Sequence, residues 1–228
     1  MTLSGQPRFF NVPLDTATIP QNHLNIDNKA RSNLLPWNGQ FSPQLVEVLL
    51  QTYAKSGSRV LDPFVGSGTV LHEAGRCGFP AFGSDINPAA FKMASIYSLV
   101  NLDLIRRRRV VEHIGDLLNQ LIPDTQPLFA KAIDRDDLPV DEKLMGYART
   151  ATDPYVRRLL EGVIVLLNFG DNSFDKRGVN VAWAKLRNVL RSLPFSEAPI
   201  ELANCDARYL PLRASCVDLN SLARSWEG

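Results

Sequence analysis

The stretch Val60-Leu61-Asp62-Pro63-Phe64-Val65-Gly66-Ser67-Gly68-Thr69 decides the fold. Its first two residues are apolar and run directly into a turn signal, which is typical of the end of a buried strand. Pro63 ends the strand because it has no N–H to donate to a ladder. The two glycines allow positive φ and a close approach of the backbone to a ligand. The sequence therefore predicts a strand that runs into a ligand-facing glycine turn.

A helix and a second strand are expected after this turn. Residues 69–77 are predicted to be helical, with Thr69 at the start and Gly78 in the position of a C-terminal cap. Residues 81–84 are predicted to form a strand that carries Asp85 at its carboxyl end. Strand, turn, helix, strand and acid make one βαβ unit, with a ligand crevice above its strand ends.

The residues of the turn favour one kind of cofactor. A dinucleotide site requires G-x-G-x-x-G, but Leu71 stands where the third glycine would be. Asp62 instead suits an ammonium group, while the hydroxyls of Ser67 and Thr69 and the helix N-terminus suit a carboxylate. Asp85 would accept hydrogen bonds from both ribose hydroxyls, each worth about 1.5–3 kcal/mol. S-adenosylmethionine carries both ends in one molecule, so we expect it as the cofactor; the alternative is a structural glycine turn in an unrelated α/β protein.

Two motifs carry a family resemblance. Asp62-Pro63-Phe64-Val65-Gly66-Ser67-Gly68-Thr69 resembles the cofactor-binding motif of the amino-group DNA methyltransferases, which modify adenine-N6 or cytosine-N4, and Ser84-Asp85-Ile86-Asn87-Pro88 resembles their second motif. Transfer RNA and rRNA methyltransferases that modify guanine carry close variants of the first motif. The resemblance implies an α/β, Rossmann-like S-adenosylmethionine-dependent methyltransferase fold, here with a partial sheet and a helical insertion.

Residues 1–41 read as an N-terminal arm and lead-in motif, rich in Pro, Asn and Thr. Ser42 and Pro43 are an N-cap and a first-turn proline, so a helix is expected to begin there. The segment resembles the family motif before the cofactor strand, in which Phe41, Pro43 and also Trp37 would close over the methionine part of the cofactor. The alternative is a hydrophobic lead-in that only packs the helix.

The remaining chain divides into three expected parts. Residues 42–102 form the cofactor-binding βαβ core, residues 103–199 form a helical insertion that could supply target recognition or a lid, and residues 200–228 hold the third strand and the truncated start of the fourth. The insertion contains Arg106–Arg109, predicted as a solvated helix face, with a phosphate contact on a nucleic acid as the alternative.

The third family motif is present, but the catalytic motif is not. Residues 200–207 resemble the third cofactor motif, in which Asp206 would accept a bond from the adenine amino group. The fourth strand of the family ends in a polar residue, Pro-Pro and an aromatic, on which a flipped-out base stacks. No such string occurs in the sequence, and Asp153-Pro154-Tyr155, the nearest imitation, is predicted to be a helix cap.

The missing motif leads to an expectation about the whole protein. The chain is either a truncated product or one half of a split enzyme, in which a second chain supplies the catalytic half. Since the fourth strand of the family pairs with the first, the first strand is expected to be exposed as an edge. The catalytic residues are therefore unknown. The resemblance implies these cofactor-binding residues: Phe41, Pro43, Asp62, Pro63, Phe64, Gly66, Ser67, Gly68, Thr69, Asp85, Ile86, Asn87, Asp206 and Ala207.

Composition bounds the possible functions. Hydrophobic residues make up 45% and charged residues 21% of the 228 residues, as in an ordinary globular protein, and the net charge of +1 means that any DNA contact must come from a local patch. The three cysteines have no metal-ligand spacing, so no metal is expected, and an odd number of thiols indicates a reducing cytoplasm. No apolar run reaches transmembrane length.

The function implied by the resemblance is methyl transfer from S-adenosylmethionine to the exocyclic amino group of adenine or cytosine in DNA, in a restriction-modification or regulatory setting. Two alternatives remain open. One is a relative of the RNA guanine methyltransferases, with tRNA or rRNA as the substrate. The other is a non-catalytic cofactor-binding subunit that completes the sheet of a partner chain.

Overall fold

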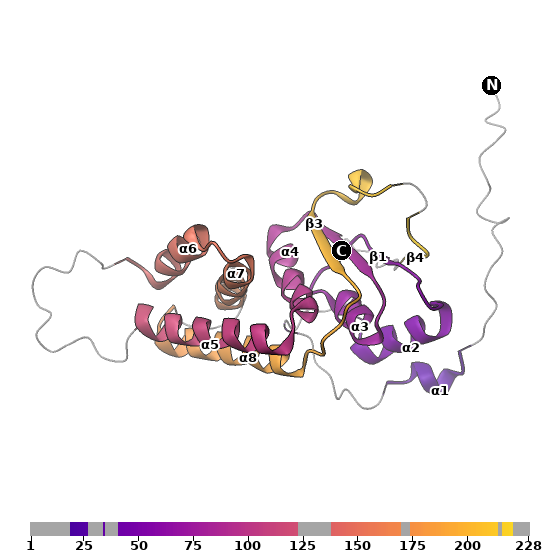
Figure 1. The fold of residues 1–228 in the computed structure, drawn as a ribbon, viewed down its shortest axis with the longest axis horizontal. Helices are drawn as coiled ribbons and strands as arrows, with labels where there is room; N and C mark the ends of the chain where they lie inside the picture. Colours follow the sequence, from indigo (N-terminus) through magenta and orange to yellow (C-terminus); the bar gives the residue numbers. More distant parts are fainter. Residues whose placement is uncertain are drawn as a thin grey trace, which may run out of the picture.

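A computed structural model describes residues 19–26, 34, 41–122, 138–169, 174–213 and 216–220 (Figure 1). Its elements, in chain order, are α1 (Gln21–Leu24), α2 (Pro43–Tyr53), β1 (Val60–Asp62), α3 (Thr69–Cys77), β2 (Ala81–Asp85), α4 (Pro88–Ser95), the 3-10 helix η2 (Ile96–Asn101), α5 (Leu104–Leu121), α6 (Val140–Thr150), α7 (Pro154–Asn168), α8 (Lys176–Ser192), β3 (Ile200–Asn204), the 3-10 helix η3 (Ala207–Tyr209) and β4 (Leu219–Asn220). The α/β class predicted from the sequence is confirmed.

The strands form one parallel sheet in the order β3-β2-β1-β4. The chain adds β2 and β3 on one side of β1 and then returns to add β4 on the other side. In an open parallel sheet, ligands bind beyond the carboxyl ends of the strands at the point where the strand order reverses. That point lies here between β1 and β4, next to the glycine turn.

The βαβ unit agrees with its prediction. Helix α3 begins at Thr69, and Gly78 caps its end at φ 76°, with its N–H directed at the carbonyls of Ala74 and Gly75. Strand β2 runs one residue further than predicted and includes Asp85. Local turn chemistry was sufficient to fix the end of β1 and both ends of α3, because each of these boundaries carries a glycine or a proline.

Proline and a capping side chain begin the next helices in the same way. Ser42 accepts from the N–H of Leu45 at 3.2 Å to start α2, and Asn87 accepts from the N–H of Ala89 at 2.9 Å to start α4. From Asn87 and Pro88, the sequence predicts a single helix that continues to about residue 101. The structure divides it into an α-helical part and the 3-10 helix η2.

Helices occupy all of residues 103–199 that form regular structure among the residues described. In Figure 1, α5, α6, α7 and α8 gather to one side of the sheet, and α7 packs against α4. The apolar core is continuous from the sheet into this helical group. The charged segment 134–141 is predicted from the sequence to be a connection. This is wrong at its end, because Val140 and Asp141 already belong to α6; residues 134–137 lie outside the described residues.

The arginine run Arg106–Arg109 is not uniformly solvated. Arg107 is 4% exposed and donates to backbone carbonyls, including Leu193, Pro194 at 2.9 Å and Leu102 at 3.1 Å. Burial lowers the pKa of its guanidinium. The prediction of a solvated face is therefore wrong for this arginine, which ties the start of α5 to the segment after α8.

Strand β1 is not an open edge along its whole length, so that expectation also needs correction. Val60 pairs with Leu219 and Leu61 with Asn220, in parallel register. Just before this pairing, the Asp218 carboxylate accepts from the backbone N–H and from the side-chain Nε of Arg59, both at 3.0 Å. A short backbone segment is sufficient to cover the two buried residues at the start of β1.

No helix in the described part of the chain is both long and apolar enough to cross a membrane.

Candidate cofactor-binding site

The glycine turn is joined to the end of β2 by a carboxylate. Asp85 accepts from the backbone N–H of Gly66 through Oδ2 and from that of Asn87 through Oδ1, both at 2.9 Å. Beside these bonds, the N–H of Val65 donates to the carbonyl of Ser84 at 2.8 Å. The structure therefore brings the residues of the first two motifs together at the carboxyl ends of adjacent parallel strands, as the sequence predicted from their order.

Asp85 has acceptor capacity beyond these two bonds. Each carboxylate oxygen has two acceptor sites, and one backbone N–H takes up one site on each oxygen. The residue is partly exposed, so the other two sites can reach a ligand. Two neighbouring ribose hydroxyls would supply donors in the same number.

The other polar residues of the turn are placed more deeply than the sequence indicated. Asp62 is 2% exposed, and its carboxylate accepts from the N–H of Phe64 at 3.2 Å. Ser67 and Thr69 are 3% and 7% exposed. Their predicted contacts with an ammonium and a carboxylate remain predictions, and Asp62 first of all shapes the turn.

Apolar side chains surround the strand ends. Phe64 is 46% exposed after β1, and Ile86 is 70% exposed after β2. Exposed large apolar side chains beside a buried polar turn are suited to the flat face of a base.

The second glycine of the turn is required by packing as well as by its backbone angle. Gly68 has φ 88°, and a Cβ built there would lie 2.6 Å from Cδ2 of Tyr97 and 3.0 Å from Cα of Ala94. Burial raises the pKa of the Tyr97 phenol, and a backbone hydrogen bond at Leu34 acts in the opposite direction. Tyr97 thus packs directly against the turn. Its role was not predicted from the sequence, since no local signal marks it.

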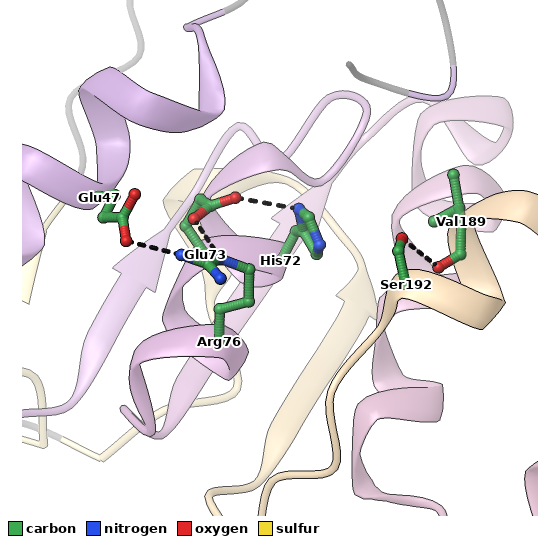
Figure 2. A network of polar contacts seen from close by, with 6 residues as sticks. All are labelled: Glu47, His72, Glu73, Arg76, Val189 and Ser192. Atoms are coloured by element: carbon green, nitrogen blue, oxygen red, sulfur yellow. Dashed lines mark hydrogen bonds and ion pairs between the residues drawn. The ribbon is translucent and has the colours of Figure 1, made fainter. Parts of the chain in front are cut away.

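A network of polar side chains on α3 links this helix to α2 (Figure 2). Glu73 is fully buried and pairs with Arg76 at 2.9 Å, and Arg76 also reaches Glu47 of α2 at 2.6 Å. His72 lies with its Nδ1 at 3.2 Å from Glu73, and its ring stacks on Tyr97 with centroids 4.9 Å apart. Hydrogen bonding to Glu73 raises the pKa of Arg76. The network joins α2 and α3 and supports the tyrosine under the turn.

Helix α3 begins at a residue without a capping side chain. Ser42, Asn87 and three aspartates cap α2, α4, α5, α7 and α8, whereas the N-cap residue of α3 is Gly68, which has no side chain to cap it. The first N–H groups of a helix have no intrahelical partner and carry the positive end of its dipole. A carboxylate group placed at the turn fits this end of α3.

Asn204 links the third strand to the site. Its side-chain amide donates to the carbonyl of Asp85 at 2.7 Å and to that of Ile86 at 3.3 Å. It thereby fixes the backbone that presents both residues. Asn204 is not among the site residues predicted from the sequence, although a polar residue at the end of a predicted strand is a signal that could have identified it.

Gly83 is a second omission in the sequence analysis. A Cβ on this β2 residue would lie 2.8 Å from Cδ1 of Leu71 and 2.9 Å from Cγ2 of Val65. Glycine inside a strand often marks such a close approach. Here it lets α3 and the turn settle against the strand.

Asp206 follows β3 but is already engaged. Its two oxygens accept four hydrogen bonds from Arg208, one from the backbone N–H and three from the guanidinium, at 2.6–3.0 Å. The side-chain bonds from Arg208 lower the pKa of Asp206 to about 2. For Asp206 to accept the predicted hydrogen bond from an adenine amino group, the Arg208 side chain must therefore move aside. Ala207 begins η3 next to it.

Phe41 and Pro43 lie at the start of α2. Pro43 is buried as the first residue of the helix, and Phe41 is 38% exposed. Helix α2 packs on α3, so the lead-in segment adjoins the βαβ unit. Their closure over a cofactor remains a prediction, and Trp37 lies outside the described residues.

In the described part of the chain, no group of three His, Cys, Asp or Glu side chains is placed to hold a metal ion.

The fold and the candidate site resemble a known arrangement. A parallel α/β sheet with a glycine turn after one strand and an acid after the next also occurs in folds that bind nucleotide cofactors. Residues 16–95 match the family model of the N6/N4 DNA methylases. For the segment that it covers, this match confirms the resemblance to the amino-group DNA methyltransferases.

Two curated proteins are similar to this chain over segments about as long as the family match. A type II methyltransferase, M.MjaII of Methanocaldococcus jannaschii, is 34% identical over 85 residues, which are 37% of this chain and 15% of that protein. A tRNA (guanine(10)-N2)-dimethyltransferase of Methanothermobacter thermautotrophicus is 38% identical over 74 residues, 31% of this chain and 21% of that protein. The alignments thus span a small part of each relative.

Proposed function

We propose that the site at the ends of β1 and β2 binds S-adenosylmethionine. The observation that carries the proposal is the Asp85 carboxylate, which organises the glycine turn through Gly66 and still offers one acceptor site on each oxygen. The N-terminus of α3 would hold the methionine carboxylate, and Ile86 would lie against the adenine. When bound, the cofactor supplies an electrophilic methyl group on a sulfonium.

We further propose that this cofactor-binding part serves a site-specific DNA methyltransferase that modifies the exocyclic amino group of adenine or cytosine. The DNA methylase match over residues 16–95 and the similarity to the type II methyltransferase support this assignment. The sequence holds no polar-Pro-Pro-aromatic string. Transfer is therefore proposed for an assembly in which other residues, on this chain or a second one, take the role of that motif. A restriction-modification setting in the cytoplasm fits the same assignment.

A second candidate is methyl transfer to guanine in RNA, because the tRNA dimethyltransferase is 38% identical over its matched segment. A third is a cofactor-binding subunit without activity of its own. Both would use the same cofactor site. They differ from the first in the substrate or in the need for a partner chain.

The test is transfer of radiolabelled methyl from S-adenosylmethionine to unmethylated genomic DNA and to bulk tRNA, beside a calorimetric titration of the cofactor on the same preparation. Label in DNA supports the first candidate, and label in tRNA alone the second. Binding without transfer supports either half of an enzyme or a cofactor-binding subunit, and co-purification with a chain that carries the Pro-Pro motif then distinguishes the subunit from simple truncation. Absence of binding contradicts the proposed site itself.

A further inference from the structure

Helix α8 carries a concentration of positive charge, although the net charge of the whole protein is close to zero. The chain carries 25 basic and 24 acidic residues, yet the 17 residues of α8 include five cations and no carboxylate. By comparison, α6 balances Asp141 and Glu142 against Lys143 and Arg149. Helix α8 therefore carries cations without acidic residues among them, and solubility alone does not require such a separation of charge.

The two faces of α8 differ in chemistry. Its buried face, which includes Val179, Trp183 and Leu186, packs toward α7 and α5. Its exposed face presents cations and amides with helical spacing, and the exposed Val181 lies among them. These cations and amides, called the α8 basic face below, are Arg177, Asn180, Lys185, Asn188 and Arg191.

The cations of the α8 basic face lack carboxylate partners. No ion pair joins Arg177, Lys185 or Arg191 to an acidic residue in the described ranges, whereas Arg76 and Lys92 are each paired. Arg177 also lies in the first turn of α8, where the helix dipole favours anions over cations. Helix stability therefore does not explain its presence, and binding to an external anion would.

The shape of the surface is also open to a ligand. A shallow hollow of about 470 Å³ runs along the first half of α8 and is lined by Lys176, Arg177, Asn180, Val181 and Ala184. Figure 1 shows α5 and α8 lying side by side at the edge of the helical group, away from the sheet. None of the described residues that line the hollow carries a carboxylate.

The spacing of the cations fits a polyanion better than a single small anion. With a rise of about 1.5 Å per residue, Arg177 and Lys185 are about 12 Å apart along the axis, and Lys185 and Arg191 about 9 Å. A small anion requires cations that converge on one point. Duplex DNA carries one negative charge per about 1.7 Å of its axis, so a line of separated cations can reach successive phosphates.

We propose that the α8 basic face contacts the phosphate backbone of duplex DNA. This rests on the proposed function, which supplies DNA as the substrate, and it adds the surface that holds the duplex. The cations contact phosphates and set the position of the duplex, and the two asparagines lie between them with donors and acceptors for sugar or base edges.

The test uses two matched double variants of the full chain. Lys185→Gln with Arg191→Gln removes two charges from the α8 basic face, and Lys143→Gln with Arg149→Gln removes the same two residue types from α6. Affinity for a 25-base-pair duplex is measured by fluorescence anisotropy at several salt concentrations. The α8 variant should bind about tenfold more weakly per contact at 50 mM salt and lose about 0.9 per contact from the slope of log K against log salt. The α6 variant should keep both values, and equal thermal unfolding of the two variants controls for folding.

Several results would overturn the proposal. Unchanged salt slope in the α8 variant, or an equal change in both variants, removes α8 from the interface. Tighter binding of tRNA than of the duplex, with the same dependence on α8, overturns DNA as the partner. A titration of S-adenosylmethionine separates the two proposals. If the wild type binds no cofactor but its DNA affinity depends on α8, the surface stands and the proposed function fails.

Discussion

Replacing Asp85 by alanine should weaken cofactor binding more than any other single change. The structure gives this carboxylate two free acceptor sites at the strand ends, one on each oxygen. Two charge-assisted bonds to ribose hydroxyls, partly screened because the residue is only partly buried, are worth about 2–4 kcal/mol together. At about 1.4 kcal/mol per tenfold, the dissociation constant for S-adenosylmethionine should rise about 30- to 700-fold.

The same substitution also removes two bonds that organise the turn, so the free energy of unfolding should fall by about 1–3 kcal/mol. Asp103→Ala is the matched control, because Asp103 caps α5 through the N–H of Arg106 at 2.8 Å and lies outside the site. Loss of that cap costs about 0.5–2 kcal/mol. Calorimetry on both variants, below their unfolding temperatures, separates binding from stability. An unchanged dissociation constant for Asp85→Ala, or an equal loss in the control, would refute the reasoning.

Three further predictions concern stability and titration. Gly68→Ala should cost about 1–3 kcal/mol more in urea unfolding than Gly57→Ala, since both have positive φ but only Gly68 faces Tyr97 and Ala94; equal losses would contradict the packing argument. Arg107→Ala should lower the free energy of unfolding by about 3 kcal/mol by leaving buried carbonyls without a donor, while Arg108→Ala should stay within about 0.5 kcal/mol. The Asp206 carboxyl should titrate in NMR near pH 2 and return toward about 3.9 when its arginine partner becomes alanine. Because its folded pKa is lowered, the contribution of this pair is present above the unfolded value and is lost as the pH falls toward 2.

The parts of the fold that the sequence predicted are those with local signals. Pro63, Gly68 and Gly78 mark the ends of β1 and α3, and Ser42 and Asn87 mark the starts of α2 and α4. Each of these residues acts through its own backbone or through an N–H two or three positions away. A reader of the sequence therefore has everything that decides these boundaries.

The parts that the sequence did not predict depend on partners far along the chain. Arg107 is one of four consecutive arginines, and only the carbonyls of Leu193 and Pro194 distinguish it from its neighbours. Tyr97 reaches the turn only because η2 folds back beneath Gly68. Helix α6 buries so few apolar residues that its periodicity was hidden among charges.

The site shows the same division. The sequence correctly brought the glycine turn and Asp85 together, since the carboxyl ends of parallel strands share one edge of the sheet. It could not show that Arg208 is bonded to Asp206, because the partner of an exposed side chain depends on the local backbone conformation. It also did not show how deeply Asp62 is buried.

The most direct test of the central claim is an NMR titration of the ¹⁵N-labelled chain with S-adenosylmethionine. The account predicts saturable changes in the amide shifts of Gly66 and Gly68 in the turn, of Asp85 at the end of β2 and of Asn87 just after it. The amide of Lys185 on α8 should not move. No change in the spectrum, or changes centred away from the ends of β1 and β2, would contradict the account.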